Sequence, residues 1–238
     1  MRNKGFTLIE LSIVIVIIGL IVAGVVGGQT LVNQSKLRAV ISDVNKYRVA
    51  INTFKLEYNA LPGDMVNAQD YFGVDVSNGN GNKLIGDVDI SEPESFGAFE
   101  HLSKAKLIQS SFTGVGPAEI GVNSPKSPYS ADTTFYFYSG NLWNKYRRGN
   151  SLVLTGAGGY SDYLVNISDA HNIDKKVDDG LPYLGRVITY SNTDGDCVAS
   201  GQRLQSVTIA TKDNVQYAIN QTDDLCTMHF GVNNYSFR

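Results

Sequence analysis

The chain has 238 residues, a formal net charge of −3, and 42% hydrophobic against 18% charged residues. These proportions exclude collagen-like, disulfide-dense and wholly disordered chains. The acidic balance argues against a general nucleic-acid coat, which needs a basic face to release counterions from phosphates. The mean hydropathy of −0.12 is that of an ordinary globular protein, but this average hides an N-terminal concentration of apolar residues.

A short basic leader precedes a long apolar segment at the N-terminus. Residues 1–5 contain Arg2 and Lys4 and no acid. The next 23 residues, 6–28, have only three polar side chains: Thr7, Glu10 and Ser12. At ~1.5 Å per residue such a helix is about 34 Å long, enough to cross a bilayer core of about 30 Å. The positive leader predicts that residues 1–5 stay in the cytoplasm and that the rest is translocated.

Three interpretations of the apolar segment are open: a secretory signal peptide, a simple membrane anchor, and an anchor in which Glu10 has a dedicated function. A signal peptide has an apolar region of only about 7–15 residues before a small-residue cleavage site, and Ala23-Gly24 matches such a site poorly. A carboxylate inside an apolar span costs about 2.5–3.5 kcal/mol, so it persists only with a partner or a function. Glu10 therefore favours the third interpretation.

A partner for Glu10 follows from the helical period. If a peptidase cuts after Gly5, a new α-amino group forms on Phe6, one helical turn from Glu10 and on the same face. In a single chain the two groups can pair loosely. In a bundle of such helices, Glu10 of one subunit can instead neutralise the Phe6 amine of its neighbour, which cancels two buried charges and sets the register between helices.

The stretch from Gly5 to Leu11, with its basic leader, resembles the prepilin cleavage and methylation motif of type IV pilins and type II secretion pseudopilins. The resemblance implies cleavage between Gly5 and Phe6 by a prepilin peptidase, which is also the methyltransferase, and N-methylation of Phe6. It further implies an inner-membrane precursor, an inner-membrane assembly platform as partner, and a homopolymer that forms an extracellular or periplasmic filament. Nucleic acid is not an expected partner. Pilin, pseudopilin and non-polymerising membrane-anchored binding module remain the alternatives.

The end of the apolar segment departs from the family pattern. Many members have a proline there, where the helix melts locally in the filament, and this chain has Gly27-Gly28. Two glycines cost about 1 kcal/mol each relative to alanine in a helix. We therefore predict a helix melting point at Gly27 and Gly28, with close helix packing at small residues as the alternative.

The sequence divides into a leader (1–5), a transmembrane or filament-core helix segment (6–30), and an amphipathic helix half plus a globular head (31–238). Apolar residues spaced by three and four predict one buried helix face: Leu37, Val40, Ile41, Val44, Tyr47, Ile51, Phe54 and Tyr58. Pro62-Gly63 ends this helix. The predicted fold is α+β, a long N-terminal helix packed on a head with an antiparallel sheet, as in pilins.

Within the head, residues 63–89 are predicted to be a loop. Helices are predicted from Ser91, with a Ser91/Glu94 capping box, and over residues 168–178, with Ser168 as the cap. The predicted strands are residues 134–139, 142–146, 151–155, 185–190, 205–211 and 215–220. Residues 173–187, IDKKVDDGLPYLGRV, also resemble a segment of larger pilin-like proteins.

The two cysteines, Cys197 and Cys226, allow one pairing, and export to an oxidising compartment predicts a disulfide. Closing a loop of about 30 residues stabilises the fold by ~3–4 kcal/mol in the chain-entropy model. A C-terminal bridge also resembles the disulfide-bounded region of many pilins.

We expect neither catalysis nor a resident cofactor. His101, His171 and His229 are scattered and lack metal-ligand spacing. A weak calcium loop is a candidate at Asn192, Asp194 and Asp196, although Cys197 stands where a glycine is expected and no glutamate follows at the right distance. The alternating amides Asn78, Asn80 and Asn82 have the same spacing. For both segments the competing interpretation is a polar turn held by its own side chains.

A group of aromatic and basic residues lies close together in the sequence: Tyr136, Tyr138, Trp143, Lys145, Tyr146, Arg147 and Arg148. Such interleaving suits contacts with DNA, sugars or neighbouring subunits. The alternative is a sheet whose alternate tyrosines are buried.

Overall fold

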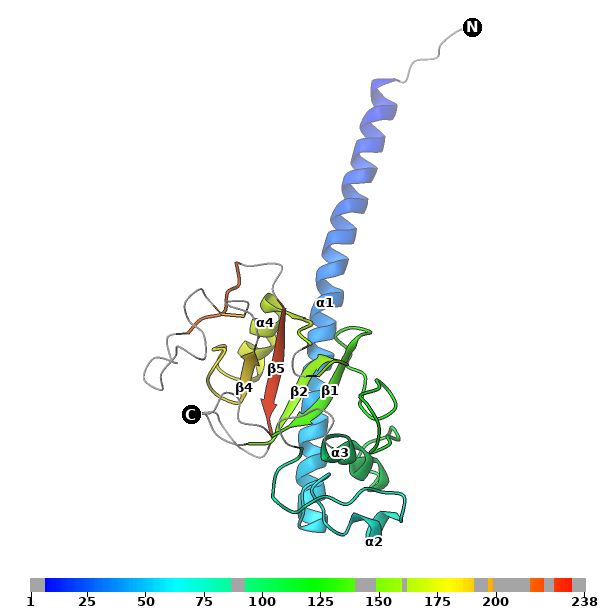
Figure 1. Ribbon diagram of the computed structural model, residues 1–238. Coiled ribbons are helices and arrows are strands. Elements are labelled where there is room, and N and C mark those ends of the chain that lie inside the picture. The colour runs from blue at the N-terminus through cyan, green and yellow to red at the C-terminus, as the bar shows by residue number, and fades with distance from the viewer. Residues whose placement is uncertain are drawn as a thin grey trace.

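The computed structural model describes residues 7–86, 93–139, 149–159, 162–190, 197–198, 215–220 and 225–232. The helices of this part are α1 (Leu8–Tyr58), α2 (Ala68–Phe72), α3 (Pro93–Lys104) and α4 (Ile167–Val177). The strands are β1 (Thr133–Tyr138), β2 (Ser151–Gly156), β3 (Val165–Asn166), β4 (Val187–Tyr190) and β5 (Leu225–Gly231). Figure 1 shows the first half of α1 projecting from a head that is built around its second half. The α+β architecture predicted from the sequence is confirmed.

Helix α1 has 51 residues, which at ~1.5 Å per residue gives about 76 Å. It ends at Tyr58 because Asn59 adopts a left-handed conformation, φ 52°, so it stops just before Pro62-Gly63. Its buried residues are confined to its second half: Leu37, Val40, Val44, Tyr47, Ala50, Ile51 and Phe54. Ile41 and Tyr58 are partly buried against the same core. The amphipathic face predicted from the spacing is therefore confirmed.

The antiparallel sheet is organised around β5. This strand pairs with β2 through Leu154 and Met228 and on its other side with β4 through Val187 and Phe230. Strand β1 extends the sheet beyond β2, and β3 pairs with the beginning of β5. The last strand in the described chain thus joins strands that come earlier, so the sheet is complete only when the C-terminal segment is in place.

The main core lies between α1 and one face of the sheet. The Tyr47 ring of α1 contacts Phe99 of α3 and Phe135 of β1, with ring centroids 5.6 and 5.7 Å apart. From the sheet, the inward side chains of β1, β2 and β5 complete this core: Phe135, Phe137, Leu152, Leu154, Met228 and Phe230. Because a buried large apolar side chain contributes about 1.5–3 kcal/mol, the buried face of the second half of α1 contributes substantially to the stability of the head.

Polar contacts fix the direction in which α1 leaves the head. Asn33 Nδ2 donates to Asp169 Oδ1 at 2.9 Å, and Tyr129 Oη donates to the other Asp169 oxygen, also at 2.9 Å. Further along, Arg48 Nε donates to the Gly231 carbonyl at 3.1 Å. The helix is therefore tied to α4 and to the end of β5 by hydrogen bonds as well as by apolar contacts.

Several predicted elements need correction. Helix α4 begins at Ile167 because Asn166, rather than Ser168, is the N-cap, its side chain accepting from the Ser168 N–H. The strand predicted over residues 215–220 is wrong, since only Tyr217 pairs, in an isolated bridge with Val198. Strand β5 was not predicted, and neither was α2 in the segment predicted to be a loop. Residues 142–146, residues 205–211 and Ser91 lie outside the described residues.

The predicted disulfide is present. Cys197 and Cys226 are bonded, with Cα atoms 5.8 Å apart and a sequence separation of 29. Since Cys226 lies in β5 and Val198 pairs with Tyr217, the bond joins the segment around residues 197–198 to the central strand. The cross-link therefore stabilises the part of the sheet that closes last along the chain.

The opposite face of the sheet carries a second, smaller cluster of Tyr136, Tyr138 and Val153. Both tyrosines are buried, as the structural interpretation of this aromatic group expects, while its members from Trp143 to Arg148 lie outside the described residues. His229 of β5 is fully buried beside them, its ring 5.6 Å from that of Tyr138. Its Nδ1 lies 3.3 Å from Ser151 Oγ.

Burial lowers the pKa of His229 to about 3, whereas an unfolded histidine titrates near pH 6.5. Below pH 6.5 the unfolded chain takes up a proton that the folded chain does not, so this residue reduces stability as the pH falls. Relative to His229→Phe, which cannot titrate, we expect the free energy of unfolding of the wild-type chain to decrease by about 3 kcal/mol between pH 6.5 and pH 4. Urea unfolding at a series of pH values measures this difference. Parallel curves for the two chains would contradict it.

Candidate functional site

The most unusual surface of the molecule is the first half of α1. Every residue from Thr7 to Lys36 is exposed, and each Leu, Ile and Val between Leu8 and Val32 is at least half exposed, Leu8 at 90%. A helix that is apolar on all sides belongs inside protein or lipid, and an apolar surface of this extent marks an interaction or membrane site. Among the described residues, α1 is the helix long and apolar enough to cross a membrane. This segment is therefore the candidate functional site.

Glu10 lies at the beginning of this segment and completes a capping box with Thr7. One Glu10 oxygen, Oε2, accepts from the Thr7 backbone N–H at 2.8 Å and from the Thr7 hydroxyl at 2.7 Å. The Thr7 hydroxyl oxygen in turn accepts from the Glu10 N–H at 3.4 Å. A carboxylate here also interacts favourably with the positive end of the helix dipole. Glu10 thus has a local partner, Thr7, in the single chain, and this capping box was not predicted from the sequence.

The glycines of this segment lie within α1, and the helix is unbroken at each of them. Gly27 and Gly28 both lie within α1, and a Cβ atom added at Gly19, Gly24, Gly27 or Gly28 would meet nothing within 4 Å. Nothing in the described part of the chain requires glycine at these positions. They therefore leave room for close approach of another helix, and the melting point at Gly27-Gly28 in a filament stays a prediction.

Other predicted site residues lie outside the described part of the chain. These are the cleavage-site residues Gly5 and Phe6 and the candidate calcium ligands Asn192, Asp194 and Asp196. The alternating amides are described: Asn80 and Asn82 each form a polar turn, whereas Asn78 accepts from the first turn of α2. Asn80 Oδ1 accepts from the Asn82 N–H, Asn82 Oδ1 from the Leu84 N–H, and Asn78 Oδ1 from the Gln69 N–H.

The three histidines lie on three different elements, α3, α4 and β5. His101 is buried, where its Nδ1 accepts from the Gly63 N–H at 2.9 Å and its Nε2 lies 2.9 Å from the Ser77 carbonyl oxygen. Burial lowers the pKa of His101. This histidine therefore joins the loop after α1 to α3, a structural role.

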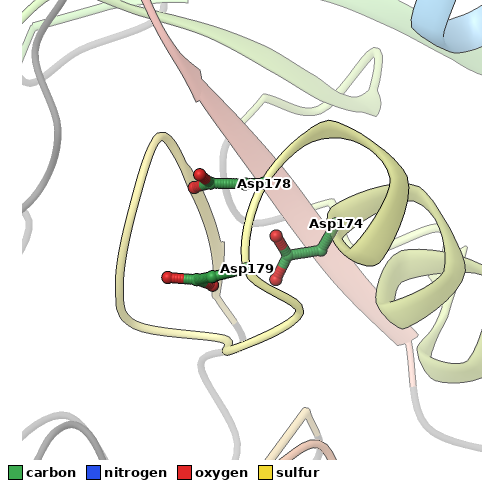
Figure 2. Close-up of side chains that lie close together, drawn as sticks. All are labelled: Asp174, Asp178 and Asp179. Atoms are coloured by element: carbon green, nitrogen blue, oxygen red, sulfur yellow. The ribbon is translucent and has the colours of Figure 1, made fainter.

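A group of acidic side chains in the head was not predicted as a metal site from the sequence. Asp174 in α4 and Asp178 and Asp179 just after it each place one carboxylate oxygen within 4.8 Å of the others (Figure 2). Burial raises the pKa of Asp174 to about 7, and the charges of Asp179 and Asp178 add to this effect, whereas the Tyr217 hydroxyl opposes it. The signal was present in the DKKVDD sequence, but it becomes a cluster only because the chain turns back after α4.

Comparison with known protein families identifies the N-terminal segment of the chain. Residues 1–26 match the family described as the prokaryotic N-terminal methylation motif. No curated protein and no solved structure matches the chain. The chain therefore carries the prepilin signature of type IV pilins and pseudopilins, and this signature coincides with the leader and the exposed apolar half of α1.

Proposed function

We propose that the chain is a structural subunit of a type IV pilus-like filament, exported through the inner membrane and polymerised through the apolar half of α1. The observation that carries this proposal is the coincidence of a prepilin signature at residues 1–26 with the first half of α1, whose large apolar side chains are all exposed. A membrane buries that surface in the precursor, and neighbouring copies bury it in the filament. The head is the part displayed outward, and no catalytic role is assigned to it.

Processing comes first in this scheme. The prepilin peptidase removes the leader with Arg2 and Lys4 by cutting between Gly5 and Phe6, and methylates the new amino group of Phe6. The inner-membrane assembly platform then extracts the subunit and adds it to the filament. The signature is shared by pseudopilins, so a periplasmic filament of a type II secretion system is the alternative in the same class.

Glu10 is proposed to neutralise the Phe6 amine of the neighbouring subunit. In the single chain its carboxylate accepts two hydrogen bonds from Thr7, and a carboxylate has acceptor capacity for a further donor. Cancelling the two charges removes most of the cost of placing them in an apolar bundle. Because only one axial offset between helices brings the groups together, the pair also selects the register.

Substituting Glu10 tests this mechanism. We expect Glu10→Ala to retain leader cleavage and to lose filaments almost completely, as measured by N-terminal mass and by electron microscopy of sheared surface material. Glu10→Gln is the matched control, since its side-chain oxygen can still accept from Thr7 but carries no charge. Loss of filaments in both variants supports charge neutralisation. Normal filaments from Glu10→Ala would refute the pairing, and normal filaments from Glu10→Gln alone would assign the role to capping.

Substituting Gly5 tests the processing step separately. Gly5→Val places a branched side chain at the cleavage site, so we expect the leader to remain attached and the chain to stay in the membrane fraction. Intact mass spectrometry distinguishes the two forms. Efficient removal of residues 1–5 from this variant would show that the cleavage site has been assigned wrongly.

A further inference from the structure

The acidic cluster of Asp174, Asp178 and Asp179 lies in the head, away from the apolar half of α1. Figure 2 shows the Asp174 carboxyl group extending from α4 toward the segment that carries the other two. One carboxylate oxygen from each residue lies within 4.8 Å of the others. Three like charges this close repel one another unless a proton or a cation is shared among them.

The protein holds one oxygen of each carboxylate by a hydrogen bond. Asp174 Oδ2 accepts from the Tyr217 hydroxyl at 2.7 Å, and Asp179 Oδ1 accepts from the Leu181 N–H at 2.8 Å. Asp178 Oδ2 accepts from two backbone N–H groups, those of Arg186 and Val187. The three side chains are therefore fixed in place by donors outside the cluster.

A glycine closes the turn on Asp178. Gly185 has φ +72°, and a Cβ atom there would overlap the Asp178 carboxylate. Only glycine permits both this backbone conformation and this close approach. The DDGLPYLG segment is thus shaped around the acidic group.

Asp174 gives an independent indication of a ligand. Its side chain is fully buried, and Oδ1 has no hydrogen-bond partner in the described chain. A buried acceptor without a partner is costly, and more so when it is charged. The Arg48 guanidinium interacts with Asp178 and with Arg186, but no hydrogen bond from either arginine reaches Asp174 Oδ1, and Arg48 Nη2 and Arg186 Nε also have no partner among the described residues. The cluster therefore contains a buried position that suits a cation.

The geometry points to a divalent-cation site, selective for calcium, formed by Asp174, Asp178 and Asp179. Calcium binds oxygen at ~2.3–2.6 Å, so ligands of one ion lie up to about 5 Å apart, which matches the observed spacing. Magnesium requires ~2.0–2.1 Å and a regular octahedron, to which three carboxylates already fixed by hydrogen bonds from outside the cluster do not readily adjust. Asp179 is exposed, so water can supply the remaining ligands. This site does not depend on the proposed filament function.

A bound ion would connect parts of the head that are distant in sequence. Asp174 belongs to α4, and Asp178 is bonded to the start of β4. Through the Tyr217 hydroxyl the cluster also contacts the segment that pairs with Val198, next to the disulfide. The expected consequence is a head whose C-terminal half is stabilised by calcium.

Terbium luminescence and thermal unfolding of the full chain in detergent micelles test this site. Terbium substitutes for calcium, and Tyr217 lies close enough to sensitise it. We expect one saturable calcium-displaceable site with a dissociation constant on the order of 10⁻⁴–10⁻³ M, and at 10 mM calcium a rise in melting temperature of roughly 3–10 °C. Asp179→Asn keeps the hydrogen bond from Leu181 but removes one charge, and it should weaken binding about tenfold or more.

Two control variants complete the experiment. Asp132→Asn changes an exposed aspartate outside the cluster, and Asp194→Asn changes the other candidate calcium loop; both should bind calcium like the wild-type chain. The proposal is overturned if no saturable site exists, if Asp179→Asn binds normally, if Asp194→Asn removes the binding, or if magnesium stabilises the chain as well as calcium does. If no saturable site exists, a proton alone relieves the repulsion among the three carboxylates.

Discussion

The hydrophobic effect acts on α1 in two ways along its length. From Leu37 onward the apolar residues occupy one face, and the head covers that face. Before Leu37 they occupy all faces, and the described residues of the chain cover none of them. At about 1.5–3 kcal/mol for each large apolar side chain, leaving this half in water is far more costly than the usual margin of protein stability. The single chain therefore requires lipid or other copies around it.

The head is arranged so that this requirement does not compromise its own fold. The core of the head is separate from the apolar half of α1. It is formed by the buried face of α1, the aromatic residues of α3 and β1, and the central strand β5. Hydrogen bonds from Asn33 and Arg48 hold the helix to α4 and β5. In the proposed scheme, the apolar half of α1 passes from a membrane to a filament while the head keeps one structure. The disulfide, and the proposed cation beside Tyr217, reinforce the C-terminal half of that head.

Sequence patterns predicted the elements that can be identified from neighbouring residues alone. They were less successful for strands, whose formation depends on pairing with distant segments of the chain. Helix α1 and strands β1 and β2 were predicted, since a 3.6-residue period or an aromatic run bounded by turn residues is enough to identify each. Strand β5 was missed although Thr227 and His229 alternate with apolar neighbours, as in a strand with one polar face; in the structure both of these polar side chains are buried, so each face of the strand is covered. Residues 215–220 have strand-like composition but pair only at Tyr217. Likewise, Glu10 was predicted as a functional residue, but its capping box with Thr7 was seen only in the structure. The proximity of Asp178 to Asp174 also depends on how the chain turns after α4.

The central claim is that copies of this chain bury one another's apolar helices, and photo-crosslinking in cells tests it most directly. A benzophenone side chain placed at Ile17, in the middle of the exposed segment, should give covalent dimers and higher multimers of this chain when the leader is cleavable. The same probe at the exposed head position Asp132 is the control for nonspecific crosslinking. If the Ile17 probe gives only monomers in cells that remove the leader, the apolar half of α1 is a lipid anchor and the account is wrong.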